Sequence, residues 1–479
     1  MRDLVTRRSR AVGGVAGPLL FVQAPPRVRL GEMVLIRMPD GERRGQVIEL
    51  SEQHAVIQVL EETLGLRPDD AEVTFTGEVA TLAVGRGMLG RVLDGMGRPS
   101  DGLPPPVPEA VLPLGGVPIN PVRRARPAEL IETGISAIDG LATLVRGQKL
   151  PIFSGAGLPA PRLAAQVVRQ ARVAGGEPFA VVFCGMGIPA READFYLASF
   201  QDVAERTAVI LNRASDPTIE RLLAPRCALS LAEFLAFNHG IHVLVILTDM
   251  TSYCEALREV ALAREEIPAR RGYPGDMYTD LASIYERAGL IQGRAGSVTQ
   301  LPIVTMPDDD ITHPVPDLTG YVTEGQLVLS RELHRRGVFP PIDVLPSLSR
   351  LMNGGIGPGR TREDHRALAD QLYAFYARGR EVRRMEAIVG AEGLTTEQRG
   401  LLAFAERFEQ GFIHQGAQRR TIGETLETGW QMLAGFAPAA LNRIPESLIA
   451  RYRPQGALHG EIAGDTHGAA GGQGDPARG

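Results

Sequence analysis

A glycine-rich turn between an apolar run and a helical pattern is the part of the sequence that most resembles a phosphate-binding motif. Residues 150–154 are strand-like, the turn begins at Gly155, and a helical pattern starts at Leu163. In a working phosphate loop, Gly-x4-Gly-Lys-Ser/Thr, backbone N–H groups cradle the phosphates and the lysine neutralises them. Here residues 160–162 are Ala, Pro and Arg. Proline removes both the charge and a backbone donor, so we expect phosphate-loop architecture without its phosphate chemistry.

The chain contains one lysine, Lys149, and the other fifty of its 51 basic residues are arginines. GC-rich coding explains this bias and agrees with the 55 glycines and 35 prolines. Lys149 precedes the turn on its strand side, so it does not replace the missing loop lysine. For Arg162 two interpretations stay open, contact with an anion or a solvated position at the start of a helix. Chemistry that needs a lysine amine must use Lys149 or be excluded.

Two further apolar runs lead to residues that could act beside a phosphate. The run 241–248 ends at Asp249, and an apolar strand followed by an aspartate holds magnesium in nucleotide-hydrolysing enzymes. Capping of the strand or of the next helix explains Asp249 equally well. The run 179–184 is followed by Gly-Met-Gly-Ile at 185–188. The fold that carries these positions decides whether they serve a nucleotide.

Bulk composition excludes several classes of protein. With 479 residues, 44% hydrophobic and 22% charged, the chain has material for two to four globular domains. Its formal net charge of −5 argues against broad binding to nucleic acid or to an anionic membrane. The three cysteines have no Cys-x-x-Cys spacing, so we expect reduced thiols and no metal site. No run of 18 apolar residues predicts a membrane span, and the start of the chain favours a pair of strands over an export signal.

Three regions differ in their patterns and must position these residues. Short β-rich runs separated by Gly, Pro and Asp fill residues 1–76 and predict a small β-barrel. Residues 77–355 alternate near-continuous apolar runs with helical patterns, which predicts a parallel sheet covered on both faces. The helical periodicity of residues 356–459 predicts a bundle, and the glycine-rich residues 460–479 predict a disordered tail.

Individual elements follow from the same patterns. In the barrel, strands are expected over 32–37, 44–50 and 54–59; in the middle region, strands are expected over 150–154, 179–184, 208–211, 241–248 and 301–306, and helices over 163–174, 190–205 and 252–266. The Pro-rich segment 103–121 predicts an extended connection. In the bundle, Thr395 with Gln398 and Thr421 with Glu424 have capping-box spacing.

Several separated motifs, in order, resemble the B subunit of V/A-type rotary ATPases, which is the non-catalytic, regulatory subunit. The motifs are Ser154-Gly-Ala-Gly-Leu-Pro159, Arg271-Gly-Tyr-Pro-Gly-Asp-Met-Tyr-Thr-Asp-Leu-Ala282 with Ile284-Tyr-Glu-Arg-Ala-Gly289, Thr319-Gly-Tyr-Val-Thr-Glu-Gly-Gln326, and Pro340-Pro-Ile-Asp-Val-Leu-Pro-Ser-Leu-Ser-Arg350. The resemblance covers roughly residues 10–453. It implies a multidomain fold with an N-terminal β-barrel, a central α/β RecA-like core with a degenerate phosphate loop, and a C-terminal α-helical bundle.

The resemblance also implies roles for single residues. In catalytic subunits of these machines, a glutamate after the Gly-x-Gly of the third strand orients the attacking water, and Ile188 stands at that place here, where it can do no acid–base work. Arg350 is implied to project across the subunit interface as an arginine finger toward the γ-phosphate bound by a neighbouring catalytic A subunit. Such a finger contributes about 10³–10⁵ in rate. Ser347, Ser349 and Tyr321 are candidate contacts at the same interface.

The implied assembly is a hexameric ring in which this chain alternates with three A subunits. The ring would couple ATP synthesis or hydrolysis to H⁺ or Na⁺ transport, through contacts with a central rotor shaft and a peripheral stalk. ATP or ADP with Mg would bind at the interface with the A subunit. No nucleotide is expected to bind tightly to this chain alone. We expect the ring to lie at the cytoplasmic face of the cell membrane and to be attached to the membrane only through the ion-translocating sector. No nucleic acid is expected as a partner.

Three alternatives remain at this point. A non-catalytic α subunit of an F-type synthase usually keeps the loop lysine, which is absent here. A hexameric RecA-like RNA translocase would need an intact phosphate loop and a basic, aromatic barrel surface, and neither is seen in the sequence. A stand-alone nucleotide-binding module would reveal itself by binding ATP as an isolated chain.

Overall fold

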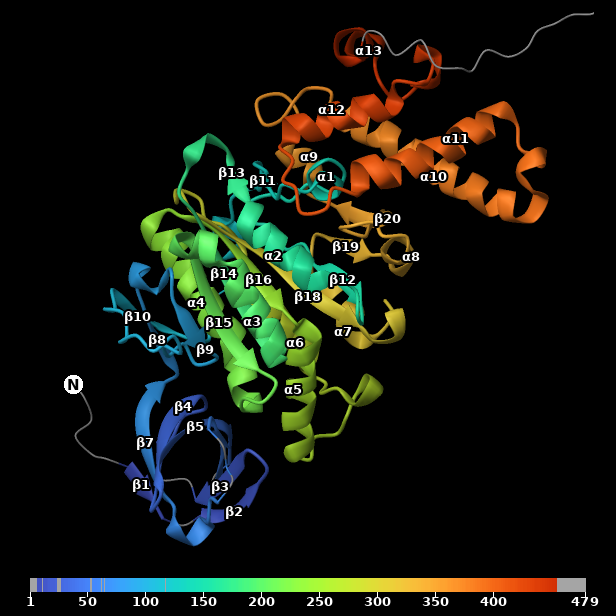
Figure 1. Ribbon diagram of the computed structural model, residues 1–479. Helices are drawn as coiled ribbons and strands as arrows, with labels where there is room; N and C mark the ends of the chain where they lie inside the picture. Colours follow the sequence, from blue (N-terminus) through green and yellow to red (C-terminus); the bar gives the residue numbers. More distant parts are fainter. Residues whose placement is uncertain are drawn as a thin grey trace, which may run out of the picture.

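The computed structural model describes residues 7–454 apart from residues 11, 24–26, 52, 53, 62, 64 and 117. From one end to the other it consists of a β-barrel, a layered α/β domain and a helical bundle (Figure 1). This is the fold class that the patterns and the resemblance implied. The tail expected at 460–479 lies outside the described residues. None of the described helices is both long and apolar enough to span a bilayer.

Seven antiparallel strands form the barrel, in the order β1-β7-β4-β5-β6-β3-β2. They are β1 (Arg7–Ser9), β2 (Val12–Ala16), β3 (Leu19–Gln23), β4 (Glu32–Met38), β5 (Gly41–Leu50), β6 (His54–Val59) and β7 (Glu72–Val79). Alternate side chains such as Val34, Ile36 and Val47 are fully buried, because successive residues of a strand face opposite sides. The three strands expected over 32–59 are present, and the expected opening pair is the β2–β3 hairpin.

A short segment joins the barrel to the central domain. β8 (Thr81–Val84) pairs with β10 (Ala110–Pro113), which lies within the Pro-rich segment expected as an extended connection. β9 (Val92–Asp94) pairs with a strand of the central sheet. A separate two-stranded ladder joins β11 (Ile131–Glu132) to β13 (Arg172–Val173).

The central sheet has the strand order β20-β19-β12-β18-β16-β14-β15-β9, with β17 paired beside β18. Its strands are β12 (Ile152–Gly155), β14 (Phe179–Ile188), β15 (Thr207–Arg213), β16 (His242–Thr248), β17 (Gly289–Leu290), β18 (Ser297–Met306), β19 (Gly325–Leu329) and β20 (Ile342–Ser349). Neighbouring strands from β19 to β9 run parallel, whereas β20 runs antiparallel to β19 at the edge. All five expected apolar strands are present, and their continuous apolar runs reflect burial on both faces.

Helices cover both faces of this sheet (Figure 1). The helices of the central domain are α1 (Ser136–Asp139), α2 (Ala160–Gln170), α3 (Ala190–Ser199), α4 (Thr218–His239), α5 (Met250–Ala263), α6 (Met277–Tyr285), α7 (Pro314–Val322), α8 (Arg331–Arg335) and α9 (Met352–Gly355). α2 and α3 share one apolar core with the bundle, and α4, α5 and α6 share a second core on the opposite face. Along β14, Val181 and Phe183 face the first core, while Val182 and Cys184 face the second.

The expected helices of this domain differ from the observed ones at their ends. α2 begins three residues earlier than expected, because Pro161 is favoured in the first turn of a helix, and it ends four residues earlier, before β13. α3 stops at Ser199 and is followed by a 3₁₀ turn over Gln201–Arg206. α5 begins two residues early because Asp249 caps its N-terminus.

The bundle contains α10 (His365–Val389), α11 (Thr396–Arg407), the π-helix Phe408–Ile413, α12 (Ile422–Leu433) and α13 (Glu446–Tyr452). The apolar face expected on α10 is buried against α11 and α12. Both capping boxes form as expected, at Thr395 and at Thr421. The bundle is therefore stabilised by the helical periodicity and the caps that its sequence shows.

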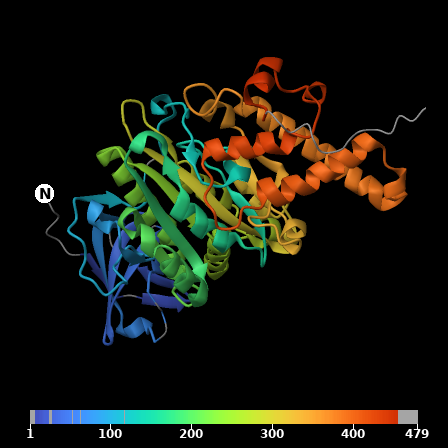
Figure 2. The same ribbon diagram turned by 45° about the horizontal axis from the view of Figure 1, so that its top comes forward.

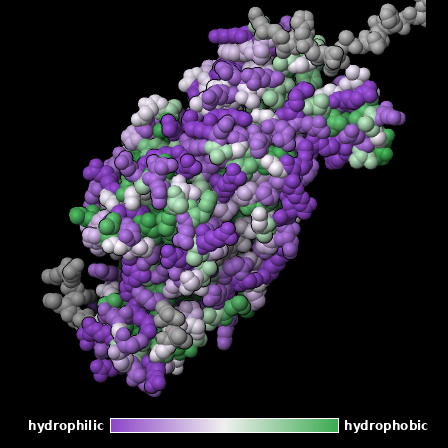
Figure 3. Space-filling view, viewed as in Figure 1, coloured by the Kyte–Doolittle hydropathy of each residue, from purple (hydrophilic) through white to green (hydrophobic). Residues whose placement is uncertain are grey.

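The hairpin of α10 and α11 extends away from the body of the molecule (Figures 1 and 2). The face seen in Figure 3 is largely hydrophilic, with apolar side chains gathered at the free end of this hairpin. Ile388 there is 85% exposed, and Met385 and Val389 are also exposed. Three neighbouring apolar side chains in water are more than the scattered exposure usual on a protein surface.

Candidate functional site

The degenerate loop has the strand-turn-helix geometry of a phosphate loop but few free backbone donors. β12 ends at Gly155 and α2 begins at Ala160. The N–H of Leu158 donates to the Gly155 carbonyl at 3.1 Å, and the N–H of Ala160 donates to the Leu158 carbonyl at 2.8 Å. Pro159 and Pro161 carry no N–H. Four of its positions therefore have no N–H to offer a phosphate.

An ion pair of the chain's own side chains lies against this loop. Arg331, the first residue of α8, donates to both carboxylate oxygens of Asp309 at 2.7 Å and to the carbonyl of Ala156 at 2.9 Å. The hydrogen bonds from Arg331 hold the pKa of Asp309 below its usual value. A Cβ built on Gly155 would lie 1.8 Å from an oxygen of Asp309, so only glycine fits there. The residues meet because β18 and β19 flank β12 in the sheet.

Arg162 is accounted for by a contact inside the chain. Its guanidinium lies over the ring of Phe339, 3.9 Å from the ring centroid, which is a cation–π contact. The second interpretation of Arg162, an exposed position at the start of a helix, agrees with this geometry. The loop, with Pro161 in place of lysine and Arg162 turned to an aromatic ring, does not fit a nucleotide phosphate.

Asp249 connects the end of β16 to two neighbouring elements through hydrogen bonds. Its Oδ1 accepts hydrogen bonds from the N–H of Thr251 at 2.8 Å and of Thr305 at 3.1 Å. The first bond caps α5 and the second joins β16 to β18, while burial raises the pKa of Asp249. Among residues that the structure describes, no group of three or more His, Cys, Asp or Glu side chains is placed to hold a metal ion.

Ile188 ends β14 with a side chain only 3% exposed in the apolar core. The preceding Gly187 donates its N–H to Oδ1 of Asn212 at 3.1 Å, and Arg221 donates to the same oxygen at 3.0 Å. The Gly-x-Gly segment is thus part of β14 and held in place. The residue that follows it is a buried hydrocarbon, which can neither accept nor donate a proton.

Arg350 follows β20 and is exposed. Its backbone N–H donates to the carbonyl of Glu324 at 3.0 Å, which anchors the main chain. Within the described part of the chain, no residue forms a hydrogen bond or ion pair with its guanidinium. The side chain is therefore free to contact a group outside this chain.

Arg350 and the degenerate loop lie at opposite ends of the neighbouring strands β20, β19 and β12. Because β20 is antiparallel to β19, its last residue lies beside Glu324, which precedes β19, and beside Gln148, which precedes β12. The loop follows the other end of β12. At about 3.3 Å per residue, the distance from Gln148 to Gly155 is about 20 Å. Arg350 therefore cannot contact an anion held by its own loop.

Ser349 directly precedes Arg350 in the chain, and Tyr321 lies on the helix that leads to Glu324. The Ser349 hydroxyl accepts a hydrogen bond from Nε2 of Gln148 at 2.9 Å. Tyr321 is 75% exposed near the end of α7, three residues before Glu324 in the sequence. With Leu348, which is 45% exposed, these residues give the edge around Arg350 a mixed apolar and polar surface.

Ser347 lies elsewhere. It is buried, its hydroxyl donates to the carbonyl of Asp343 at 2.6 Å, and the same oxygen accepts from the N–H of Val328 at 2.9 Å. The first contact lies within β20, and the second joins β20 to β19. The structure therefore places Ser349 next to Arg350, Tyr321 at an exposed position of α7, and Ser347 inside the sheet edge.

Comparisons with known proteins agree with this architecture. Residues 12–77 match the β-barrel domain of the ATP synthase alpha/beta family, residues 134–349 match its nucleotide-binding domain, and residues 354–453 match the C-terminal domain of V and A type ATP synthase. The V-type ATP synthase beta chain of Anaeromyxobacter sp. (strain K) is 67% identical over 461 residues, covering 94% of this chain and 96% of that one. The chain belongs to the family of V-type ATP synthase beta chains.

More distant relatives match the chain over most of its length. The V-type ATP synthase beta chain of Thermus thermophilus is 55% identical over 464 residues, covering 95% of this chain and 97% of that one. A solved structure described as a unique ATP synthase subunit NeqB from Nanoarcheaum equitans is 39% identical with a TM-score of 0.70, covering 87% of this chain and 98% of that one. The similarity to V-type beta chains thus extends over nearly the whole chain and indicates a subunit of a rotary ATP synthase, rather than an RNA translocase or an F-type α subunit.

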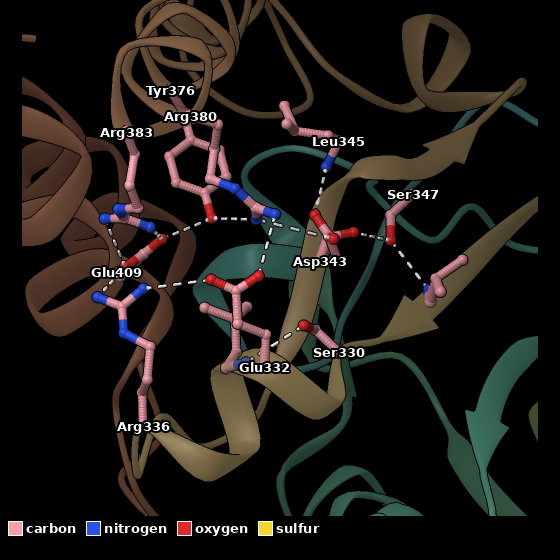
Figure 4. A network of polar contacts seen from close by, with 12 residues as sticks. Ser330, Glu332, Arg336, Asp343, Leu345, Ser347, Tyr376, Arg380, Arg383 and Glu409 are labelled. Carbon is pink, nitrogen blue, oxygen red and sulfur yellow. Dashed lines mark hydrogen bonds and ion pairs between the residues drawn. The ribbon is translucent and has the colours of Figure 1, made fainter. Parts of the chain in front are cut away.

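In this V-type beta chain a polar network joins the nucleotide-binding domain to the bundle (Figure 4). At its centre Glu409 of the π-helix is fully buried. It accepts from Arg383 at 2.7 and 3.1 Å and from the Tyr376 hydroxyl at 3.0 Å, both on α10. Its remaining partner, Arg336 at 2.6 Å, directly follows α8. Arg331 at one end of α8 touches the degenerate loop, and Arg336 at the other touches the bundle.

A second part of the network runs through Arg380 of α10. It contacts Glu332 of α8 at 3.3 Å and Asp343 of β20 at 3.9 Å. Burial raises the pKa of Asp343, although Arg380 opposes this shift. α8 and β20, which carry Arg331 and lead to Arg350, are both attached to the same helix of the bundle.

Sequence patterns did not single out Arg331, Asp309 or Glu409. Arg331 is 22 residues from Asp309 and 175 from Ala156 in the chain, so no local spacing brings these groups together. Only the strand order β19-β12-β18 does so. For Glu409, the one available indication was a charged residue between Phe408 and Phe412 on an apolar face.

Proposed function

We propose that this chain is the non-catalytic, regulatory B subunit of a V/A-type rotary ATP synthase, and that it supplies Arg350 in trans to the nucleotide of a catalytic A subunit. The observation that carries the proposal is the placement of Arg350. Its guanidinium has no partner within the described chain, and Gln148, which lies beside the end of β20, is about 20 Å from Gly155 of the chain's own loop. A cation so placed is available to an anion of a neighbouring subunit.

The state of the chain's own site supports a non-catalytic role. The loop lacks a lysine, contains two prolines and lies against an internal ion pair. Ile188 stands where hydrolysis needs a glutamate. Mg-ATP or Mg-ADP would be held mainly by the A subunit. From this side, the planar guanidinium of Arg350 would offer forked donors to γ-phosphate oxygens, and a lysine would not reproduce that geometry.

The same assignment implies the rest of the complex. The chain would alternate with A subunits in an A3B3 ring, contact a central rotor shaft and a peripheral stalk, and take part in coupling ATP synthesis or hydrolysis to H⁺ or Na⁺ movement. The ring would lie at the cytoplasmic face of the cell membrane, attached through the ion-translocating sector. Tyr321 and Ser349 would line the interface next to Arg350.

Turnover of the assembled complex tests the finger. Arg350→Ala and Arg350→Lys are each assembled with the A subunit, and ring formation is checked by size-exclusion chromatography. We expect intact rings whose kcat for ATP is lower by about 10³-fold or more. Arg67→Ala, at an exposed arginine of the barrel domain, is the matched control and should turn over like wild type.

Two results would overturn the proposal. Wild-type turnover by rings that carry Arg350→Ala would remove the finger role. ATP hydrolysis by the isolated chain at a rate comparable to the complex would remove the non-catalytic assignment.

A further inference from the structure

The only lysine of the chain is a buried structural cation. Lys149 is 4% exposed, and its Nζ lies 2.8 Å from Oε1 of Glu286 and 2.9 Å from Oε1 of Glu324. A buried ammonium is stable only when carboxylates and hydrogen bonds compensate its lost hydration. Lys149 thus joins the start of β12 to the segment after α6 and to the segment before β19.

Lys149 and Glu324 hold each other through main-chain bonds as well. The N–H of Lys149 donates to Oε2 of Glu324 at 2.8 Å, and the N–H of Glu324 donates to the carbonyl of Lys149 at 3.0 Å. The Glu324 carboxylate therefore accepts from both the backbone and the ammonium of one residue. Its position beside β12 is determined by three separate contacts.

The carbonyl of Glu324 is in turn the anchor of Arg350. It accepts from the N–H of Arg350 at 3.0 Å and from Nε2 of Gln148 at 3.0 Å. Gln148 is fully buried, and its side chain also bonds the Ser349 hydroxyl. Ser349 is thus attached directly to Gln148, and Arg350 is attached to Glu324, which Lys149 holds.

We infer that Lys149 is a positioning residue for Arg350, acting through Glu324. This inference rests on the proposed finger role. Arg350 has an exposed side chain whose direction is set by its main chain, and the main chain is held by the carbonyl of a residue that Lys149 fixes. Loss of the ammonium leaves Glu324 with an uncompensated charge, and its carboxylate then turns toward water. A displacement of about 1 Å at a catalytic group costs on the order of 100-fold in rate.

The variants Lys149→Met and Glu324→Gln test this in the assembled complex. Methionine keeps the length of the side chain and removes its charge, and glutamine keeps the shape of glutamate. We expect each to lower kcat for ATP by about 10- to 100-fold while KM for ATP stays within about twofold. KM for ATP is expected to stay near the wild-type value because the A subunit binds the nucleotide.

Glu286→Gln is the matched control. It removes the other carboxylate partner of Lys149, and its side chain bonds Lys149 and Arg124 but neither Glu324 nor Arg350. We expect its kcat within about twofold of wild type. An equal loss in Glu286→Gln and Glu324→Gln would show a general effect of the buried lysine and overturn the assignment.

A double variant separates positioning from a loss of structure. If Lys149 acts through Arg350, then adding Lys149→Met to Arg350→Lys should not lower the residual turnover, measured with radiolabelled ATP, any further. A multiplied loss in the double variant would overturn the positioning role. Wild-type kcat in Glu324→Gln would do the same if Lys149→Met failed to assemble. Wild-type turnover in Arg350→Ala would instead overturn the proposed function, so the two failures can be told apart.

Discussion

The guanidinium of Arg331 lies 2.9 Å from the carbonyl oxygen of Ala156, inside the turn where a phosphate loop would hold its anion. The same group binds Asp309 through two hydrogen bonds. The turn is therefore stabilised by the chain itself, with a cation that points at a main-chain oxygen. A loop that requires no ligand for its shape can keep that shape in every state of a ring.

The isolated chain should not bind Mg-ATP with micromolar affinity. Pro161 supplies neither an ammonium nor an N–H, and the N–H groups of Leu158 and Ala160 are already bonded within the loop. Isothermal titration calorimetry with Mg-ATP checks this, with the complete complex as the positive control. Micromolar, magnesium-dependent binding by the chain alone would show that the loop still functions.

Removal of the charge at Glu409 should destabilise the bundle by about 3 kcal/mol, since it leaves Arg336 and Arg383 beside a neutral buried group. The single tryptophan, Trp430, is 1% exposed in the bundle and reports its unfolding directly. We expect urea unfolding followed by Trp430 fluorescence to show the loss in Glu409→Gln. Glu381→Gln, at an exposed position of the neighbouring helix α10, should unfold within about 0.5 kcal/mol of wild type.

Stability should depend on pH through Glu220, whose pKa is raised to about 7, mainly by burial and then by the charge of Asp94. The other charged groups around it are Arg98, which opposes the shift, Asp216 and Glu61. The folded state binds the proton more tightly than the unfolded chain does. The contribution of Glu220 to stability is therefore greatest below about pH 4.3, falls as pH rises to about 7, and is level above that.

The variant Glu220→Gln isolates this contribution. We expect wild type to lose about 3 kcal/mol more than Glu220→Gln between pH 4.5 and pH 7.5, in urea unfolding followed by circular dichroism. Parallel pH profiles for the two proteins would show that Glu220 is ionised in the folded state with an ordinary pKa.

Thr421→Ala should cost about 1 kcal/mol of bundle stability. The Thr421 hydroxyl accepts from the N–H of Glu424, and the Glu424 carboxylate accepts from the N–H of Thr421 at 2.7 Å. Trp430 lies on the same helix, α12, so its fluorescence follows the transition. Glu427→Ala, on an exposed position of that helix, should change the midpoint little, and an equal loss in both variants would argue against the cap.

Much of the fold could be predicted because the relevant information is local. The parallel strands are continuous apolar runs, and the capping boxes at Thr395 and Thr421 need only a spacing of three residues. By contrast α4 was not among the helices indicated by periodicity. It is buried over most of its surface and contains Pro225, so it shows neither a polar face nor an uninterrupted helical sequence.

The candidate site divides in the same way. Arg350 stands in a contiguous motif and could be singled out, whereas Arg331 and Glu324 act through residues that are distant in the chain. Ser347 could not have been placed from the sequence. Alternation along a strand would put the apolar Leu348 inside and the serines on either side of it outside, whereas Leu348 is 45% exposed and Ser347 is buried.

Because Lys149 is buried, the permanent side-chain cations on the surface of this protein are the guanidinium groups of arginines. Guanidinium stays protonated at every pH at which proteins fold, and acylating reagents that attack amines find here a single lysine that is 4% exposed. The arginine part of the positive surface is thus constant in charge and resistant to amine chemistry. Changes in surface charge with pH come instead from carboxylates, histidines, tyrosines and terminal groups.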